Sequence, residues 1–181
     1  MKKLRPNPIS IEPPGPGAGE PQEPKQRFEL PWDLTSWAER PMLLRWITEE
    51  VETLDWQNSE LVEFLRANPS FQARALLILI TYAYALGACE SDDVVTLSYQ
   101  EPALKTLLSS HHPSATAVSR FRREHRGLLK WSLVQCFKRA LRHHYEMGDT
   151  PIPPGLRRAL GEAATNRLDL ARHMDRSVQA E

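Results

Sequence analysis

The chain has 181 residues, of which 41% are hydrophobic and 25% are charged. This balance is normal for a soluble globular protein, and the length is sufficient for one domain with a buried core and a tail. The 23 basic and 23 acidic residues give a formal net charge of zero. The chain is therefore neither basic nor acidic as a whole, and any charged surface must come from an uneven distribution.

The N-terminal segment is rich in proline and glycine. Residues 1–31 contain eight prolines and the sequence GPGAG. Such a segment buries too little apolar surface to offset the entropy that it would lose on folding. We therefore expect residues 1–31 to form a disordered leader. Order should begin near Trp32, where Trp32, Leu34 and Trp37 offer apolar surface that can dock onto the domain.

Helical periodicity recurs after the leader, and no segment shows the sustained alternation of a β-strand. We predict an all-α fold, with a compact domain of about six or seven helices over residues 32–147. A proline-rich turn and a C-terminal amphipathic helix follow within residues 148–181. The expected helical stretches are residues 41–56, 59–67, 71–89, 92–99, 102–110, 114–125, 128–147 and 155–174.

Local signals mark the ends of several of these helices. Pro41 and Pro102 are expected in first turns, where a missing N–H costs nothing. Ser91 and Ser114 are expected as N-caps, and Gly127 marks a bend or break. The three glutamates of the first helix, Glu49, Glu50 and Glu52, are expected to face solvent.

The most hydrophobic run, residues 75–89, reads as the central buried helix of the domain. At fifteen residues, interrupted by Thr81 and two tyrosines, it is shorter than a membrane span. The N-terminal sequence MKKLRPNPIS is not followed by the apolar stretch of a secretory signal. We therefore expect a cytoplasmic protein.

Two cysteines, Cys89 and Cys136, lie inside apolar runs without a C-x-x-C spacing. Buried free thiols in a reducing compartment are the expected state. Cys136, His143 and His144 fall about two helical turns apart, but an obvious fourth zinc ligand is missing. We expect no metal site and no cofactor.

Basic residues concentrate in one part of the chain. Residues 119–144 contain eight basic side chains and one acid, Glu124, so this segment carries +7 and the rest of the chain −7. With a single acid, ion pairs within these helices cannot neutralise the field. The eight are Arg120, Arg122, Arg123, Arg126, Lys130, Lys138, Arg139 and Arg142.

The helix over residues 114–125 has an apolar face and a polar face. Val118, Phe121 and His125 lie on the apolar side with Ala117. Arginine can read guanine with two hydrogen bonds, and small hydroxyls can contact phosphates or bases. With the short helix at 103–109 and the HHP turn, the segment has a helix-turn-helix outline. The expected base-facing residues are Thr116, Ser119, Arg120 and Arg123.

Basic residues of the following helix recur at multiples of four and form a slowly drifting stripe beside this helix. Such a stripe is what contacts with a phosphate backbone require, although a solvated helix face has the same pattern. The expected phosphate-contacting residues are Arg122, Arg126, Lys130, Lys138, Arg139 and Arg142.

Three stretches together resemble a known family. FQARALLILITYAYALGACES looks like the hydrophobic helix, HHPSATAVSRFRREH like the later polar helix and PMLLRWITEEVETLDW like the first helix of the InsH-type N-terminal domain of insertion-sequence DDE transposases. The similarity covers roughly residues 41–147. It implies a helical domain that recognises the DNA of the mobile element.

In that family a catalytic domain with an RNase H-like fold and three metal-binding acidic residues follows the helical domain. Here the chain continues from Met147 through GDTPIPPG, and Asp149 lies in a proline-rich turn rather than after a strand. The catalytic role is therefore not transferred to Asp149, and no catalytic residue is expected. The resemblance implies a non-catalytic DNA-binding protein that acts in element-end recognition, in regulation or in inhibition of transposition.

A different class of function stays open at this point. The chain can be a protein-interaction or dimerisation module, in which the acidic N-terminal half meets the basic helices of another copy or of a transposase. The five tryptophans of the sequence offer contact surface for such a partner. An enzyme is the least favoured interpretation, because no phosphate-binding glycine loop or nucleophile motif is present. The expected partner is double-stranded DNA, with a homodimer or a transposase as further candidates and no membrane or small-molecule substrate.

Overall fold

The computed structural model describes residues 28–54, 70–109 and 111–178. Within these ranges the chain forms one 3-10 helix and seven α-helices and no β-strand, which confirms the all-α prediction. The predicted helix at 59–67 and residues 1–27 of the predicted leader lie outside the described residues. The elements are η1 Leu34–Ser36, α1 Arg40–Glu52, α3 Ser70–Ala85, α4 Ser91–Gln100, α5 Pro102–Leu107, α6 Ala115–Glu124, α7 Arg126–His144 and α8 Pro154–Val178.

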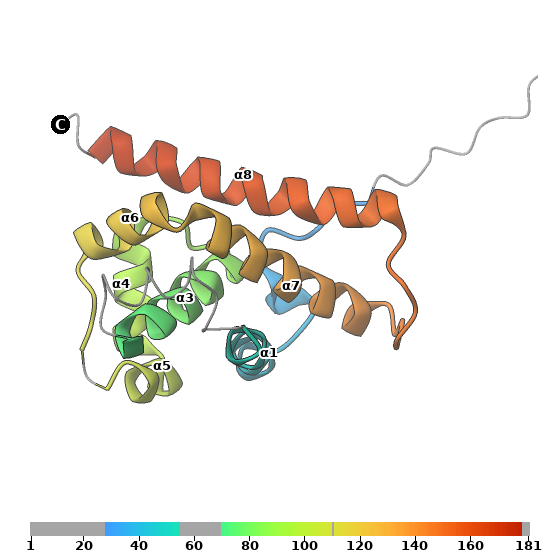
Figure 1. Ribbon diagram of the computed structural model, residues 1–181, viewed down its shortest axis with the longest axis horizontal. Helices are drawn as coiled ribbons and strands as arrows, with labels where there is room; N and C mark the ends of the chain where they lie inside the picture. The colour runs from blue at the N-terminus through green and yellow to red at the C-terminus, as the bar shows by residue number, and fades with distance from the viewer. Residues whose placement is uncertain (1–27, 55–69, 110, 179–181) are drawn as a thin grey trace, which may run out of the picture.

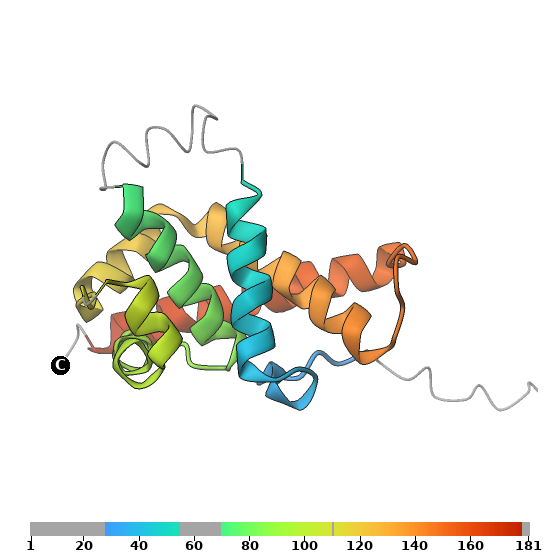
Figure 2. The same cartoon turned by 90° about the horizontal axis from the view of Figure 1, so that it is seen from below.

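Helix α3 is the centre of the core, as its apolar sequence predicts. It packs against α1, α4, α6 and α7. Figure 2 shows α1 crossing in front of α3 and α7, which contact each other directly. From Leu77 to Ala85 no side chain is more than 3% exposed. A helix that is apolar on all sides is stable only with such neighbours.

The end of α3 differs from the expected Cys89 because of Gly87. The helix stops at Ala85, and Gly87 has a φ of +81°. The N–H of Ala88 donates to Ala83 O at 2.9 Å and the N–H of Gly87 to Tyr84 O at 3.2 Å, the two bonds of a Schellman motif. Glycine adopts this left-handed conformation without steric cost.

Helix α7 ends with the same motif but without a glycine. The N–H of Met147 donates to Arg142 O at 2.9 Å and that of Glu146 to His143 O at 3.3 Å. Glu146 takes the left-handed conformation, with a φ of +49°. The helix therefore stops at His144, three residues before the expected end.

Of the two predicted N-caps, Ser114 is confirmed and Ser91 is wrong. Ser114 caps α6, since its Oγ accepts a bond from the N–H of Ala117 at 3.2 Å. Ser91 was expected to cap α4 in the same way, but it is the first residue of that helix and Glu90 is the cap residue. The break expected at Gly127 lies at His125, between α6 and α7.

The segment before α1 docks on the core, as predicted from its aromatic residues. Leu34 is fully buried, and the indole N–H of Trp32 donates to Gly87 O at 3.0 Å. Trp37 stacks on His144 with ring centroids 4.4 Å apart. A Cβ on Gly87 would lie 2.6 Å from Trp32 Cδ1, so this contact also requires glycine.

Helix α8 docks along α7 and α6 and covers both (Figure 1). It runs antiparallel to α7, and Leu160, Ala164, Leu168 and Ala171 on its inner face are fully buried. The C-terminal region is thus part of the same helical body. Within the described ranges, no helix combines the length and the apolar character that crossing a membrane requires.

Candidate nucleic-acid interface

Helix α6 presents the polar face that its sequence predicts. Val118 and Phe121 are buried in the core, whereas Thr116, Arg120 and Arg123 are exposed. In the described part of the chain, neither Arg120 nor Arg123 has a carboxylate within 4.0 Å, as the ion pairs all involve other residues. Both guanidinium groups are therefore open to an external anion.

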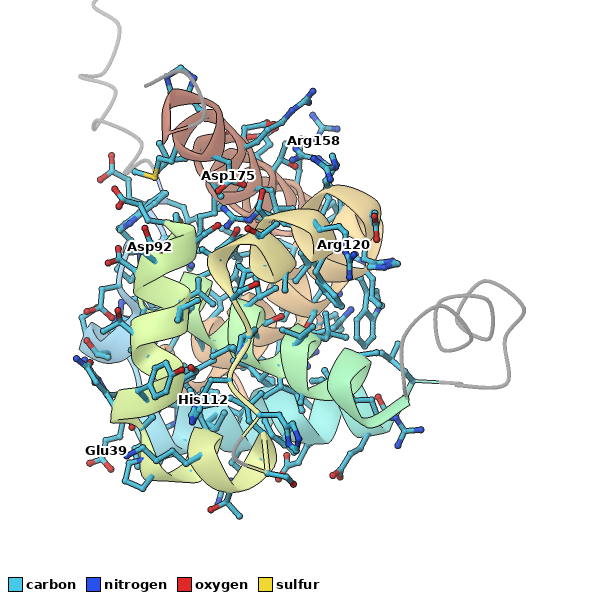
Figure 3. The ribbon with its side chains drawn as sticks, turned by 90° about the vertical axis from the view of Figure 1, so that its left-hand side faces the viewer. Glu39, Asp92, His112, Arg120, Arg158 and Asp175 are labelled. Atoms are coloured by element: carbon cyan, nitrogen blue, oxygen red, sulfur yellow. The ribbon has the colours of Figure 1, made fainter. Side chains whose placement is uncertain are left out.

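Ser119, the fourth predicted base-facing residue, is partly covered by α8. Its Oγ donates to Asp175 Oδ2 at 3.0 Å, and Figure 3 shows Asp175 where α8 meets the starts of α4 and α6. Asp175 Oδ1 also accepts a bond from Ser91 Oγ at 2.8 Å. Ser119 is thus engaged within the protein while α8 is docked.

Arg122 was predicted to contact phosphates, and that prediction is wrong. The side chain is only 4% exposed. Its Nη1 donates to Cys89 O at 2.9 Å and its Nη2 to Ser91 Oγ at 2.6 Å, while Asp175 Oδ1 lies 3.4 Å from Nη2. The guanidinium therefore links α6, α4 and α8 inside the protein.

The first turns of α7 continue the basic surface of α6. Lys130 is exposed and has no ion-pair partner in the described ranges. Arg126 is partly exposed and pairs with Asp169 of α8 at 2.7 Å. This exposed pair is weak and can exchange its carboxylate for another anion.

In the second half of the predicted stripe, carboxylates of the described residues compensate one of the three basic side chains, Arg139. Arg139 pairs with Glu49 and, at 2.7 Å, with Glu50 of α1. Of the three glutamates expected to face solvent, Glu49 and Glu52 are exposed, whereas Glu50 is partly buried. Lys138 Nζ donates to Gln135 Oε1 at 3.3 Å, and Arg142 is half-buried, with a buried Nε–H that has no acceptor in the described ranges.

The connection between α5 and α6 is longer than the sequence suggested. Residues 108–114 separate the two helices, whereas a helix-turn-helix motif usually joins its helices by three or four residues. Helix α6 packs more extensively on α4 than on any other helix. The two predicted helices are present, but α4 is the main support of α6.

Sequence reasoning missed the basic residues that α8 adds. Arg157, Arg158 and Arg172 are exposed on this helix. In Figure 3 Arg158 and Arg120 point to the same side of the molecule. The apolar residues at positions 156, 160, 164, 168 and 171 follow a helical period and are the signal that could have placed α8 against the core.

The two thiols are buried, as predicted. Burial raises the pKa of Cys89 to about 11 and that of Cys136 to about 12. His143 and His144 instead pack on Trp46 and Trp37, with centroids 5.3 and 4.4 Å apart. Among the residues that the structure describes, no three His, Cys, Asp or Glu side chains are placed to hold a metal ion.

Comparison of the chain with known protein families, with curated proteins and with solved structures finds no match. The relation to transposase N-terminal domains stays a prediction from the sequence.

Proposed function

We propose that this protein binds double-stranded DNA without catalysing a reaction on it, through the surface of α6 and the start of α7. The observation that carries the proposal is a set of exposed cations with no carboxylate partner in the described ranges. Arg120 and Arg123 lie on α6 and Lys130 on α7, and Arg172 of α8 adds a fourth. Guanidinium and ammonium groups of this kind bind phosphate oxygens.

The residues divide into two roles in the proposed complex. Thr116, Arg120 and Arg123 occupy the exposed face of one helix of ten residues, and the major groove of B-DNA is wide enough to admit an α-helix. Arg126, Lys130 and Arg172 flank this face and contact the phosphate backbone. Ser119 joins the base-facing set only where Asp175 releases it.

The resemblance to transposase N-terminal domains supplies the proposed context. A non-catalytic relative of such a domain would recognise the ends of a mobile element, or regulate or inhibit its transposition. A transposase or a second copy of the chain is the corresponding protein partner. A cytoplasmic location agrees with these roles.

The proposal is tested by fluorescence anisotropy of the purified protein against a labelled random duplex of about 30 base pairs over a salt series. If four phosphates are neutralised, the logarithm of the affinity falls against the logarithm of the salt concentration with a slope of about −3 to −4. An affinity that does not change with salt would contradict the proposal.

The alternative function is a protein-interaction module, and the ion pairs between α1 and α7 make it the less favoured of the two. It requires acidic residues of the N-terminal half to meet the basic helices of another molecule, yet Glu49 and Glu50 already pair with Arg139 of the same chain. Light scattering measured beside the DNA titration separates the two functions. A stable dimer that fails to bind DNA would favour the alternative.

A further inference from the structure

A pocket of about 370 Å³ lies between α6, the start of α7 and the C-terminal part of α8. Its volume is in the range of small-molecule sites. Four arginines converge on it, and a serine and an aspartate complete the polar lining. They are Arg122, Arg123, Arg126, Arg172, Ser119 and Asp175.

The charge in and around the pocket is positive. Arg122 lies within ion-pair distance of Asp175. At the rim, Arg126 pairs with Asp169. Arg123 and Arg172 have no such partner among the described residues, so four guanidinium groups face two carboxylates. The remaining charge of +2 favours an anion with two negative charges or more.

The inner end of the pocket is already built around an anionic group. The carboxylate of Asp175 accepts hydrogen bonds from Ser91 and Ser119 at 2.8 and 3.0 Å and lies 3.4 Å from Arg122 Nη2. Arg122, which is 4% exposed, also has a buried Nε–H with no acceptor in the described part of the chain. Hydrogen-bond donors at this junction therefore exceed the oxygens that the protein supplies.

We propose that this pocket binds a small phosphate-bearing ligand of the pyrophosphate type, between Arg123 and Arg172. Each guanidinium can donate two parallel hydrogen bonds to a phosphate group, and α8 contributes one wall of the site. Leu168 and the aliphatic stems of the arginines give the lining an apolar part beside its charged groups. This ligand site goes beyond the proposed DNA binding and does not depend on it.

The test is calorimetric titration of pyrophosphate into the full chain at fixed ionic strength. Arg172→Gln is expected to weaken binding about ten- to hundredfold, because it removes a charge-assisted pair of hydrogen bonds. Arg158→Gln removes the same charge from the same helix outside the pocket and is expected to leave the affinity unchanged. Absence of binding in the unaltered protein, or an equal loss in both variants, would overturn the proposal.

The two proposals fail separately. Arg172 belongs to both proposed sites, so the pyrophosphate titration of Arg172→Gln reports on the pocket, whereas Lys130 lies outside the pocket and its variants report on DNA binding alone. Pyrophosphate that displaces a bound duplex would show that the pocket holds a backbone phosphate, and binding without displacement would assign a free phosphate compound. In both cases the pocket is a phosphate site.

Discussion

Arg167 carries its charge inside the molecule, with no carboxylate within 4.0 Å in the described ranges. It is 1% exposed, and it donates to the carbonyl oxygens of Tyr84 at 2.8 Å and of Pro31 and Trp32 at 2.7 Å. Its guanidinium carbon also lies 4.5 Å from the centre of the Phe137 ring. Burial lowers the pKa of this guanidinium to about 10. One side chain of α8 thus binds the N-terminal segment to the end of α3.

Arg167→Met is expected to lower the free energy of unfolding by about 2–4 kcal/mol, because three carbonyl groups each lose a hydrogen bond. Arg158→Met, on the exposed side of the same helix, should change it by less than about 0.5 kcal/mol. Urea denaturation measures both. Equal effects would show that the buried hydrogen bonds of Arg167 do not matter for stability.

Glu146→Gly is expected to stabilise the protein. Glu146 holds a φ of +49° at the end of α7 and is exposed. A non-glycine residue in this conformation carries a strain of about 1 kcal/mol, which glycine removes. A urea midpoint that rises by less than the error, or falls, would contradict this account; Glu162→Gly within α8 is the control and should destabilise.

His125 should make stability depend on pH. Its burial lowers the pKa from 6.5, and Glu124 only partly opposes the shift. Below pH 6.5 the unfolded chain takes up the proton first, so the stability that is present above pH 6.5 is lost as the pH falls through the folded pKa. Between pH 7.5 and pH 5.5 the free energy of unfolding should therefore fall less in His125→Gln than in the unaltered chain. Urea denaturation measures both, and equal decreases would contradict the prediction.

At the scale of the element, α8 determines how much of α6 is open. Asp175 holds the last turns of α8 to Ser91, Ser119 and Arg122. Asp175→Asn removes the charge that balances the buried Arg122, so we expect faster hydrogen exchange in these turns and a loss of about 1–3 kcal/mol. Asp169→Asn breaks only the exposed pair with Arg126 and should leave the exchange unchanged.

The positions of the helices can be predicted from the sequence, whereas the residues at which they begin and end are predicted less accurately. The apolar run of α3 and the cap at Ser114 suffice to predict two elements, since their signals are local. Ser91 has the chemistry of a cap, but a tertiary contact with Asp175 uses its hydroxyl instead. The end of α3 was predictable from Gly87, and that of α7 was not, because glutamate seldom takes the left-handed conformation.

At the scale of the whole molecule, the basic segment divides into an open part and a compensated part. Arg120, Arg123 and Lys130 are exposed on α6 and the start of α7. The glutamates that pair with Arg139 come from α1. Such a pair cannot be predicted from local sequence patterns, because Glu49 and Arg139 are 90 positions apart in the chain. Arg122 sits four residues after the buried Val118, which is the pattern that signals its burial.

The measurement that tests the proposed interface most directly compares two charge reversals in the same DNA titration. Lys130→Glu alters the open surface, whereas Lys105→Glu alters an exposed lysine of α5, away from α8 (Figure 1). We predict that Lys130→Glu weakens duplex binding about tenfold or more and makes the salt slope less steep by about 1–2, while Lys105→Glu binds as the unaltered chain does. Equal losses in the two variants, or none in Lys130→Glu, would contradict DNA binding through α6 and α7.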